Sequence, residues 1–180
     1  MKLLLHSCCA PCSIQSVESL IADGILPDLF WFNPNIHPYT EYHSRLDSLR
    51  VFAEDKKLSL IIEDDQQPQS PAPSPQFPLT QRCAFCYRLR FEKTASYAAE
   101  RGYDAFSTTL LISPYQNHEL IKQTGEEMAA LYGIEFLYKD FRPRFREGQS
   151  QARVAGYYMQ KYCGCIYSEE ERYGASGGSQ

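Results

Sequence analysis

Short apolar runs that alternate with helical segments constrain the fold of this chain more than any other feature. The run at the amino end, Met1–His6, has no polar alternation, which is typical of a strand buried on both faces of a parallel sheet. Further strands are predicted at Leu29–Phe32, Leu58–Ile62, Phe106–Leu111 and Phe136–Tyr138. Helices are predicted from Pro11 to Gly24, Pro38 to Lys57, Cys83 to about Arg101, His118 to Tyr132 and Ser150 to Tyr162. This alternation predicts an α/β fold with a parallel sheet flanked by helices.

The chain of 180 residues is predicted to form a single domain over residues 1–173. Five prolines fall within residues 66–79, and we expect a long extended loop there. A domain boundary is the alternative, but too few residues remain on either side for two cores. Residues 174–180 are of low complexity and are predicted to be a disordered tail.

Hydropathy and charge predict a soluble globular protein of modest net charge. No apolar run approaches the roughly 20 residues that cross a bilayer, and the start Leu3–Leu5 is too short for the core of a signal peptide. We therefore expect a cytoplasmic protein without a membrane partner. The net charge of −4 argues against indiscriminate binding of nucleic acid.

Seven cysteines fall into three groups rather than being scattered. The groups are Cys8, Cys9 and Cys12; Cys83 and Cys86; and Cys163 and Cys165. One buried cysteine is an ordinary small hydrophobic residue, but clusters in a reducing compartment indicate metal or redox chemistry. Ligands of parallel α/β sheets bind beyond the carboxyl ends of the strands, where the first group and Thr108–Tyr115 are predicted to lie. No glycine-rich phosphate-binding motif is present.

Three chemistries fit the cysteine spacing. Cys9-x-x-Cys12 with Cys83-x-x-Cys86 would suit structural zinc, and Cys9-Ala-Pro-Cys12 alone would suit a thioredoxin-like oxidoreductase. Four thiolates holding an iron–sulfur cluster, with a separate dithiol, account for more of the cysteines. Cys163 and Cys165 would close a small, strained ring on oxidation, which favours an electron relay over two further metal ligands.

Five segments in order resemble the QueH family of epoxyqueuosine reductases, from residue 3 to about residue 167. They are His6–Ser13, Asn33–Pro38, Arg82–Arg88, Ser107–Gln116 and Tyr162–Cys165. The resemblance implies reduction of the epoxide of epoxyqueuosine, at the wobble position of the tRNA anticodon, to queuosine, the last step of queuosine biosynthesis. It also implies a HUP-like (Rossmann-like) α/β fold, a [4Fe–4S] cluster, no cobalamin, and a neighbouring mononuclear iron as a further candidate cofactor.

Residue roles follow from the same resemblance. Cys8, Cys9, Cys83 and Cys86 match the cluster ligands, and Cys163 and Cys165 match a redox-active disulfide. Cys12 is left over as a candidate ligand of a second metal or a neighbour of the cluster. Spacing alone leaves open which of the first three cysteines stays free.

Epoxide reduction needs two electrons and two protons, so an acid must serve the departing oxygen. Tyr115, His118 and Asp104 are the candidates near the fourth predicted strand. His6 ends a buried strand and is predicted to orient other groups rather than to bind metal. An electron donor is also required, and the sequence does not name it.

The stretch from Lys139 to Lys161 carries six basic and two acidic side chains with aromatic residues between them. Such a stretch suits a tRNA anticodon loop, although a solvated basic face is the alternative. The candidate substrate-binding or tRNA-binding residues are Asn33, Asn35, His37, Arg82, Arg88, Ser113, Gln116, Arg142, Arg144 and Arg146. Two other functions remain open: a zinc-stabilised RNA-binding module and a thioredoxin-like thiol oxidoreductase.

Overall fold

A five-stranded parallel sheet organises the computed structural model, which describes residues 1–63 and 76–174. The strands are β1 (Leu3–His6), β2 (Asp28–Trp31), β3 (Leu60–Ile62), β4 (Ala105–Thr108) and β5 (Glu135–Phe136). Their order is β3-β2-β1-β4-β5. His6 at the end of β1 pairs in register with Phe30 of β2 and Thr108 of β4, so these strands end at one edge. The order changes direction at β1, which is where ligands of such sheets bind.

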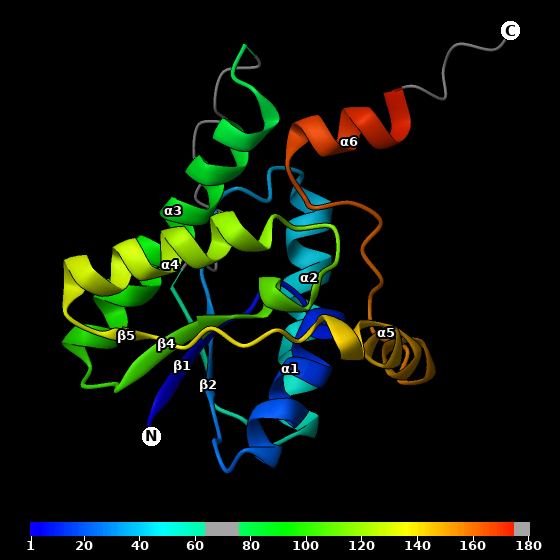
Figure 1. Cartoon of the computed structure of the whole chain (residues 1–180). Helices are drawn as coiled ribbons and strands as arrows, with labels where there is room; N and C mark the ends of the chain where they lie inside the picture. The colour runs from blue at the N-terminus through cyan, green and yellow to red at the C-terminus, as the bar shows by residue number, and fades with distance from the viewer. Residues whose placement is uncertain (64–75, 175–180) are drawn as a thin grey trace, which may run out of the picture.

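Helices cover both faces of this sheet (Figure 1). They are α1 (Ala10–Ala22), α2 (Tyr39–Asp55), α3 (Leu79–Glu100), α4 (His118–Tyr132), α5 (Phe145–Val154) and α6 (Ile166–Tyr173), with 3₁₀ helices η1 (Thr109–Ile112) and η2 (Arg142–Arg144). Helices α3 and α4 pack together on one face, and α1 packs against α2 and α5 on the other. The predicted α/β class is therefore confirmed. No helix in the described part of the chain is long and apolar enough to cross a membrane.

The core follows from the apolar strands and from one close helix approach. Leu3, Leu4 and Leu5 of β1 are completely buried, as expected for a strand covered on both faces. On the α4 side, a Cβ atom at Gly125 would lie 2.4 Å from Cε1 of Phe136, so only glycine allows α4 to lie this close to β5. Helix α1 begins well because Pro11 occupies its first turn, where a missing N–H leaves no hydrogen bond unmade.

The carboxyl-terminal prediction was wrong in its details. The expected helix over Ser150–Tyr162 is instead α5, which begins at Phe145 and ends at Val154. Gly156 has a φ of +74°, a left-handed conformation that stops the helix. The chain then crosses back over α2 and forms α6, which was not predicted.

The fourth strand is shorter than predicted, and the predicted loop and tail fall mostly outside the described residues. The fourth strand was predicted to reach Leu111 but ends at Thr108, because the Thr108 hydroxyl accepts a hydrogen bond from the N–H of Leu110 and starts η1. The predicted loop at 66–79 and tail at 174–180 fall mostly on residues 64–75 and 175–180, which lie outside the described residues.

Candidate active site

Three buried thiols, Cys8, Cys9 and Cys12, gather where β1 passes into α1, and we call them the thiol cluster. Their sulfur atoms all lie within 4.8 Å of one another. Cys9 is the residue that caps α1, and its Sγ accepts a hydrogen bond from the backbone N–H of Cys12 at 3.4 Å. The tight turn from strand to helix therefore brings together thiols that are already adjacent in sequence.

The three thiols of the thiol cluster differ in pKa. Hydrogen bonds from Cys12 and Cys9 hold the pKa of Cys8 well below its usual value, and the charge of Arg90 acts in the same direction. Burial raises the pKa of Cys9, and the hydrogen bond to Cys8 raises that of Cys12. The cluster thus accommodates one thiolate beside two thiols, and thiolates are the ligands that zinc and iron–sulfur clusters prefer.

Two residues that contact the thiol cluster were missed by sequence reasoning. Gln160 donates from Nε2 to the sulfur of Cys9 at 2.8 Å and to that of Cys12 at 3.3 Å. Thr109 donates to the sulfur of Cys8 at 3.6 Å and accepts from its backbone N–H at 3.3 Å. Thr109 lies within a segment that the sequence had singled out. Gln160 carried no signal, because its contact joins residues about 150 positions apart.

His6 supports the end of β1 next to the thiol cluster. Thr108 accepts from Leu110 through its hydroxyl oxygen, so its hydroxyl proton is available to His6 Nδ1 at 2.9 Å. The other nitrogen, Nε2, then donates to Oδ1 of Asn33 at 3.2 Å. Burial lowers the pKa of His6 to about 4, so its ring is neutral near pH 7. Both nitrogens are occupied, in agreement with the predicted orienting role.

Cys83 and Cys86 lie near the start of α3 and are half-buried. Burial raises the pKa of both thiols, while the charge of Arg90 favours the thiolate of Cys86 as it does that of Cys8. Arg90 donates to Oδ1 of Asn35 at 2.7 Å, and Asn35 is hydrogen-bonded to Cys86. A buried cation therefore links the thiol cluster to the cysteines of α3.

Cys163 and Cys165, the dithiol pair, have their sulfur atoms 3.5 Å apart. Cys165 caps α6, where its sulfur accepts from the N–H of Ser168 at 3.4 Å. The hydrogen bond from Cys163 lowers the pKa of Cys165 to about 5, and the same interaction raises the pKa of Cys163. One member is thus a thiolate and the other a thiol near pH 7, an asymmetry typical of reactive dithiols.

A buried ion pair on α2 anchors the segment that carries the dithiol pair. Arg45 donates to the carbonyl of Cys163 at 3.1 Å and to that of Tyr162 at 2.8 Å. Its Nε donates to Glu41 at 2.6 Å, and Glu41 also accepts from the hydroxyl of Tyr158. Burial alone would lower the pKa of Arg45, but the charge of Glu41 reverses this and raises it. The guanidinium therefore remains charged while it binds two backbone carbonyls.

His37 provides a second anchor for the same segment. Its backbone N–H donates to the carbonyl of Gly164 at 3.1 Å, and its Nδ1 accepts from the N–H of Ile166 at 3.2 Å. Gly164 has a φ of +106°, and a Cβ there would lie 3.1 Å from Cγ1 of Ile36. The glycine between the two cysteines is thus required both by its backbone conformation and by this close approach.

The start of α6 lies beside the start of α3 (Figure 1). The guanidinium of Arg82 lies over the ring of Tyr167, 4.4 Å from its centroid, and joins the two helices. Cys165 lies close enough to raise the pKa of both Cys83 and Cys86. The three groups of cysteines therefore lie toward the carboxyl edge of the sheet, although among the described residues only Cys8, Cys9 and Cys12 form a set of three whose sulfur atoms all lie within 4.8 Å of one another.

Comparison with known proteins identifies the family. The sequence model of the epoxyqueuosine reductase QueH family matches residues 3–171. The chain belongs to the QueH family. It is 38% identical to the epoxyqueuosine reductase QueH of Dehalococcoides mccartyi, over 96% of this chain and 95% of the relative. The QueH proteins of Acinetobacter baylyi and Thermotoga maritima are 37% and 32% identical, over 93% and 94% of this chain and 80% and 91% of theirs. The resemblance drawn from the motifs is confirmed, and with it an oxidoreductase family of queuosine biosynthesis.

Three other predicted site residues of this QueH-family chain, Asn33, Ser113 and Gln116, lie around the same edge, whereas Arg88 does not. Asn33 donates to the carbonyl of Ser7 at 3.0 Å, and Gln116 accepts from the hydroxyl of Tyr87 at 2.5 Å. The carbonyl of Ser113 accepts from Nε2 of His118 at 3.1 Å. Arg88 is exposed and lies 3.9 Å from Glu92.

Asp104 is not brought to the site. It precedes β4, and its carboxylate accepts from the backbone N–H of Lys2 at 2.6 Å, just before β1. Because β1 and β4 are parallel, this position lies at the amino edge of the sheet, opposite the cysteines. The prediction was misled because Asp104 is close to the fourth strand in sequence. It precedes that strand, whereas the site lies beyond the strand's carboxyl end.

The three arginines predicted for tRNA binding are not equivalent. Arg142 forms a two-pronged pair with Asp140, at 2.8 and 2.7 Å. Arg144 pairs with Glu147 at 3.2 and 3.3 Å. Arg146 has no hydrogen-bond or ion-pair partner among the described residues. The basic stretch of the QueH-family chain is therefore partly neutralised by its own two acidic residues.

Proposed function

We propose that this protein reduces the epoxide of epoxyqueuosine in tRNA to queuosine, at the wobble position of the anticodon, as the last step of queuosine biosynthesis. The observation that carries the proposal is the buried thiol cluster at the carboxyl edge of the sheet, in a chain of the QueH family that also brings Cys165 near Cys83 and Cys86. We place the reaction in the cytoplasm, where thiols stay reduced, and without cobalamin.

The thiols at this edge fit a [4Fe–4S] cluster held by Cys8, Cys9, Cys83 and Cys86. The fit rests on the donors: buried or half-buried sulfurs, with Arg90 near both pairs to offset the negative charge of bound thiolates. When bound, such a cluster supplies electrons one at a time. Cys12, which accepts a hydrogen bond from Gln160, remains the candidate ligand for a neighbouring mononuclear iron.

The dithiol pair matches the two-electron demand of the reaction. Removal of the epoxide oxygen breaks two C–O bonds, leaves an alkene and releases the oxygen as water. Two electrons and two protons are needed. Oxidation of one thiol and one thiolate to a disulfide yields both electrons and one proton, so an acid or solvent must supply the second proton. Cys165, already a thiolate, is positioned as the reactive sulfur, and Arg45 and His37 hold its segment in place.

Proton delivery to the departing oxygen is assigned to His118 rather than to the other two candidates. Asp104 lies at the far edge of the sheet, and the side chain of Tyr115 is 85% exposed. His118 donates from Nε2 to the carbonyl of Ser113, and its buried Nδ1 has no partner among the described residues. That nitrogen is therefore available for a hydrogen bond to the substrate. A separate electron donor must restore the dithiol pair after each turnover.

Anaerobic purification followed by iron analysis and nucleoside mass spectrometry of the treated tRNA tests this proposal. We expect a brown protein with about four irons per chain when one cluster is bound, and conversion of epoxyqueuosine to queuosine. Cys83→Ala is expected to lose both colour and activity. If Cys83→Ala keeps both, the cluster assignment is wrong.

Cys163→Ser is the matched control, because it removes a thiol without touching the proposed ligands. We expect it to stay brown and to lose turnover, which separates the relay from the cluster. A colourless, zinc-loaded protein without activity would instead favour an RNA-binding module. A colourless, metal-free protein that reduces protein disulfides would favour a thioredoxin-like enzyme.

A further inference from the structure

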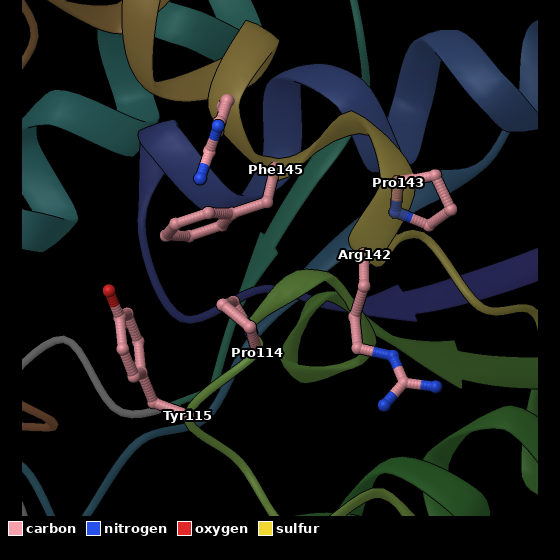
Figure 2. Close-up of a pocket in the computed structure, with 6 residues that line it drawn as sticks. Pro114, Tyr115, Arg142, Pro143 and Phe145 are labelled. Carbon is pink, nitrogen blue, oxygen red and sulfur yellow. The ribbon is translucent and has the colours of Figure 1, made fainter.

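A surface cleft of about 450 Å³ lies between the loop that follows η1 and the start of α5. Its lining residues are Pro114, Tyr115, Arg142, Pro143, Phe145 and Arg146. Figure 2 shows the Tyr115 and Phe145 rings close together at one end of the cleft, with Pro114 beside them and Arg142 farther along. No cysteine lines this cleft, so the proposed redox chemistry does not explain it.

The aromatic side chains offer stacking surfaces. The rings of Tyr115 and Phe145 are 5.9 Å apart and nearly perpendicular, and Tyr115 is 85% exposed. A large exposed ring on a short loop contributes nothing to the core. Its flat face is available to another flat group, and proteins that bind single-stranded RNA use aromatic faces in this way.

The charge of the cleft favours an anion. Two of the six lining residues are arginines, and no lining residue is acidic. Asp140 already compensates Arg142, whereas Arg146 has neither a hydrogen bond nor an ion pair within the described part of the chain. One uncompensated guanidinium beside two aromatic rings matches the phosphate and base of a nucleotide.

The cleft belongs to the same edge of the molecule as the thiol cluster. η1 continues from β4, and its first residue, Thr109, contacts Cys8. α5 packs on α1, where a Cβ at Gly148 would lie 3.4 Å from the carbonyl oxygen of Pro11. Both walls of the cleft are thus attached to the segment that carries the thiol cluster, which places the cleft at the same edge of the molecule.

We propose that this cleft binds one unstacked nucleotide of the anticodon loop, next to the nucleotide that is modified. The base stacks on the exposed ring of Tyr115, which Phe145 supports through a perpendicular ring contact, and its phosphate binds Arg146. The inference rests on the proposed function and adds a recognition site to it. An acidic peptide would also use Arg146 but would have no need of the exposed ring of Tyr115, so the pairing of ring and cation favours RNA.

Binding of an anticodon stem-loop RNA, measured by fluorescence anisotropy over a series of salt concentrations, tests the proposal. We expect Tyr115→Ala to weaken binding about 5- to 150-fold, the usual range for loss of one stacked base. Tyr115→Phe keeps the ring and should bind like the wild type. Arg146→Ala should weaken binding and reduce the salt slope by about one.

Arg153→Ala is the matched control for charge, because Arg153 is an exposed arginine of the same helix that does not line the cleft. It should change binding less than Arg146→Ala does. Wild-type binding by both Tyr115→Ala and Arg146→Ala would overturn the proposal. A second pattern would also overturn it: Arg146→Ala weakens binding to polyglutamate as much as binding to RNA, and Tyr115→Ala leaves RNA binding unchanged. That pattern would indicate a site for an acidic peptide.

The activity assay separates this inference from the proposed function. If the wild type reduces epoxyqueuosine in tRNA and the Tyr115→Ala variant does so with unchanged KM, the cleft inference fails and the function stands. If the wild type, loaded with iron and reduced, leaves epoxyqueuosine intact, the proposed function fails whatever the cleft binds.

Discussion

Replacing Arg45 with methionine should destabilise the protein strongly, because it leaves a buried carboxylate without its cation. Arg45 and Glu41 are only 2% and 5% exposed, and their pair is one turn of α2 apart. In Arg45→Met, Glu41 retains the hydroxyl of Tyr158, while the carbonyls of Tyr162 and Cys163 lose their donor. Removal of one partner from a buried ion pair destabilises proteins by about 3–5 kcal/mol.

For a domain of this size each kcal/mol lowers Tm by roughly 2–4 °C, so a decrease of roughly 6–20 °C is expected. Urea unfolding of the reduced protein, followed by circular dichroism, gives the free energy directly. Arg50→Met is the matched control on the same helix: Arg50 is 46% exposed and lies 3.1 Å from Asp47. An exposed pair of this kind contributes about 0–1 kcal/mol, so this variant should differ little from the wild type.

The double variant Arg45→Met/Glu41→Leu decides the cause. It removes both charges, so much of the lost stability should return, although the two backbone carbonyls remain without donors. A loss below about 1 kcal/mol in Arg45→Met, equal to that of Arg50→Met, would refute the argument from burial. Failure of the double variant to recover any stability would show that the carbonyl contacts, rather than the ion pair, dominate.

Three further outcomes follow from the packing and the thiols. Gly125→Ala should lower Tm in a thermal scan, because overpacking against Phe136 costs about 1–3 kcal/mol and outweighs the gain of about 1 kcal/mol in helix propensity. The double variant Gly125→Ala/Phe136→Leu should recover part of the lost Tm in the same scan. Alkylation of Cys165 by iodoacetamide, followed by mass spectrometry, should be nearly independent of pH between pH 7 and 8, because a thiol whose pKa is about 5 is fully ionised there. An increase of about tenfold per pH unit would mean an ordinary thiol with a higher pKa. Gln160→Leu should weaken iron retention about 10- to 100-fold in a chelator competition, because it removes the donor to Cys9 and Cys12; retention equal to that of the wild type would exclude this supporting role.

The sequence predicted those parts of the fold that depend on neighbouring residues. The apolar run of β1 and the adjacent cysteines at its end are local, and both were located correctly. The carboxyl-terminal third was harder, because Gly156 interrupts what otherwise resembles a continuous helix. A glycine that ends a helix in a left-handed conformation cannot be distinguished in sequence from a glycine that is tolerated within a continuous helix.

The supporting contacts of the site could not be predicted, because they join distant parts of the chain. Arg45 binds the carbonyl of Cys163 across 118 residues, and nothing in the neighbourhood of Arg45 marks it as different from Arg50. The same holds for charge: the basic stretch was read as a whole, yet Asp140 and Glu147 each neutralise a particular arginine. Side-chain pairing of this kind depends on backbone geometry that composition does not contain.

The contact of Gln160 with the thiol cluster also has a consequence for biosynthesis. Cys9 leaves the ribosome long before its hydrogen-bond donor, which follows 151 residues later. At about 5–20 residues per second, the interval is roughly 8–30 s. During that time the amino-terminal thiols of the nascent chain lack their last covering element. The site is therefore completed late in translation, and cofactor loading before then would have to take place on an incomplete protein.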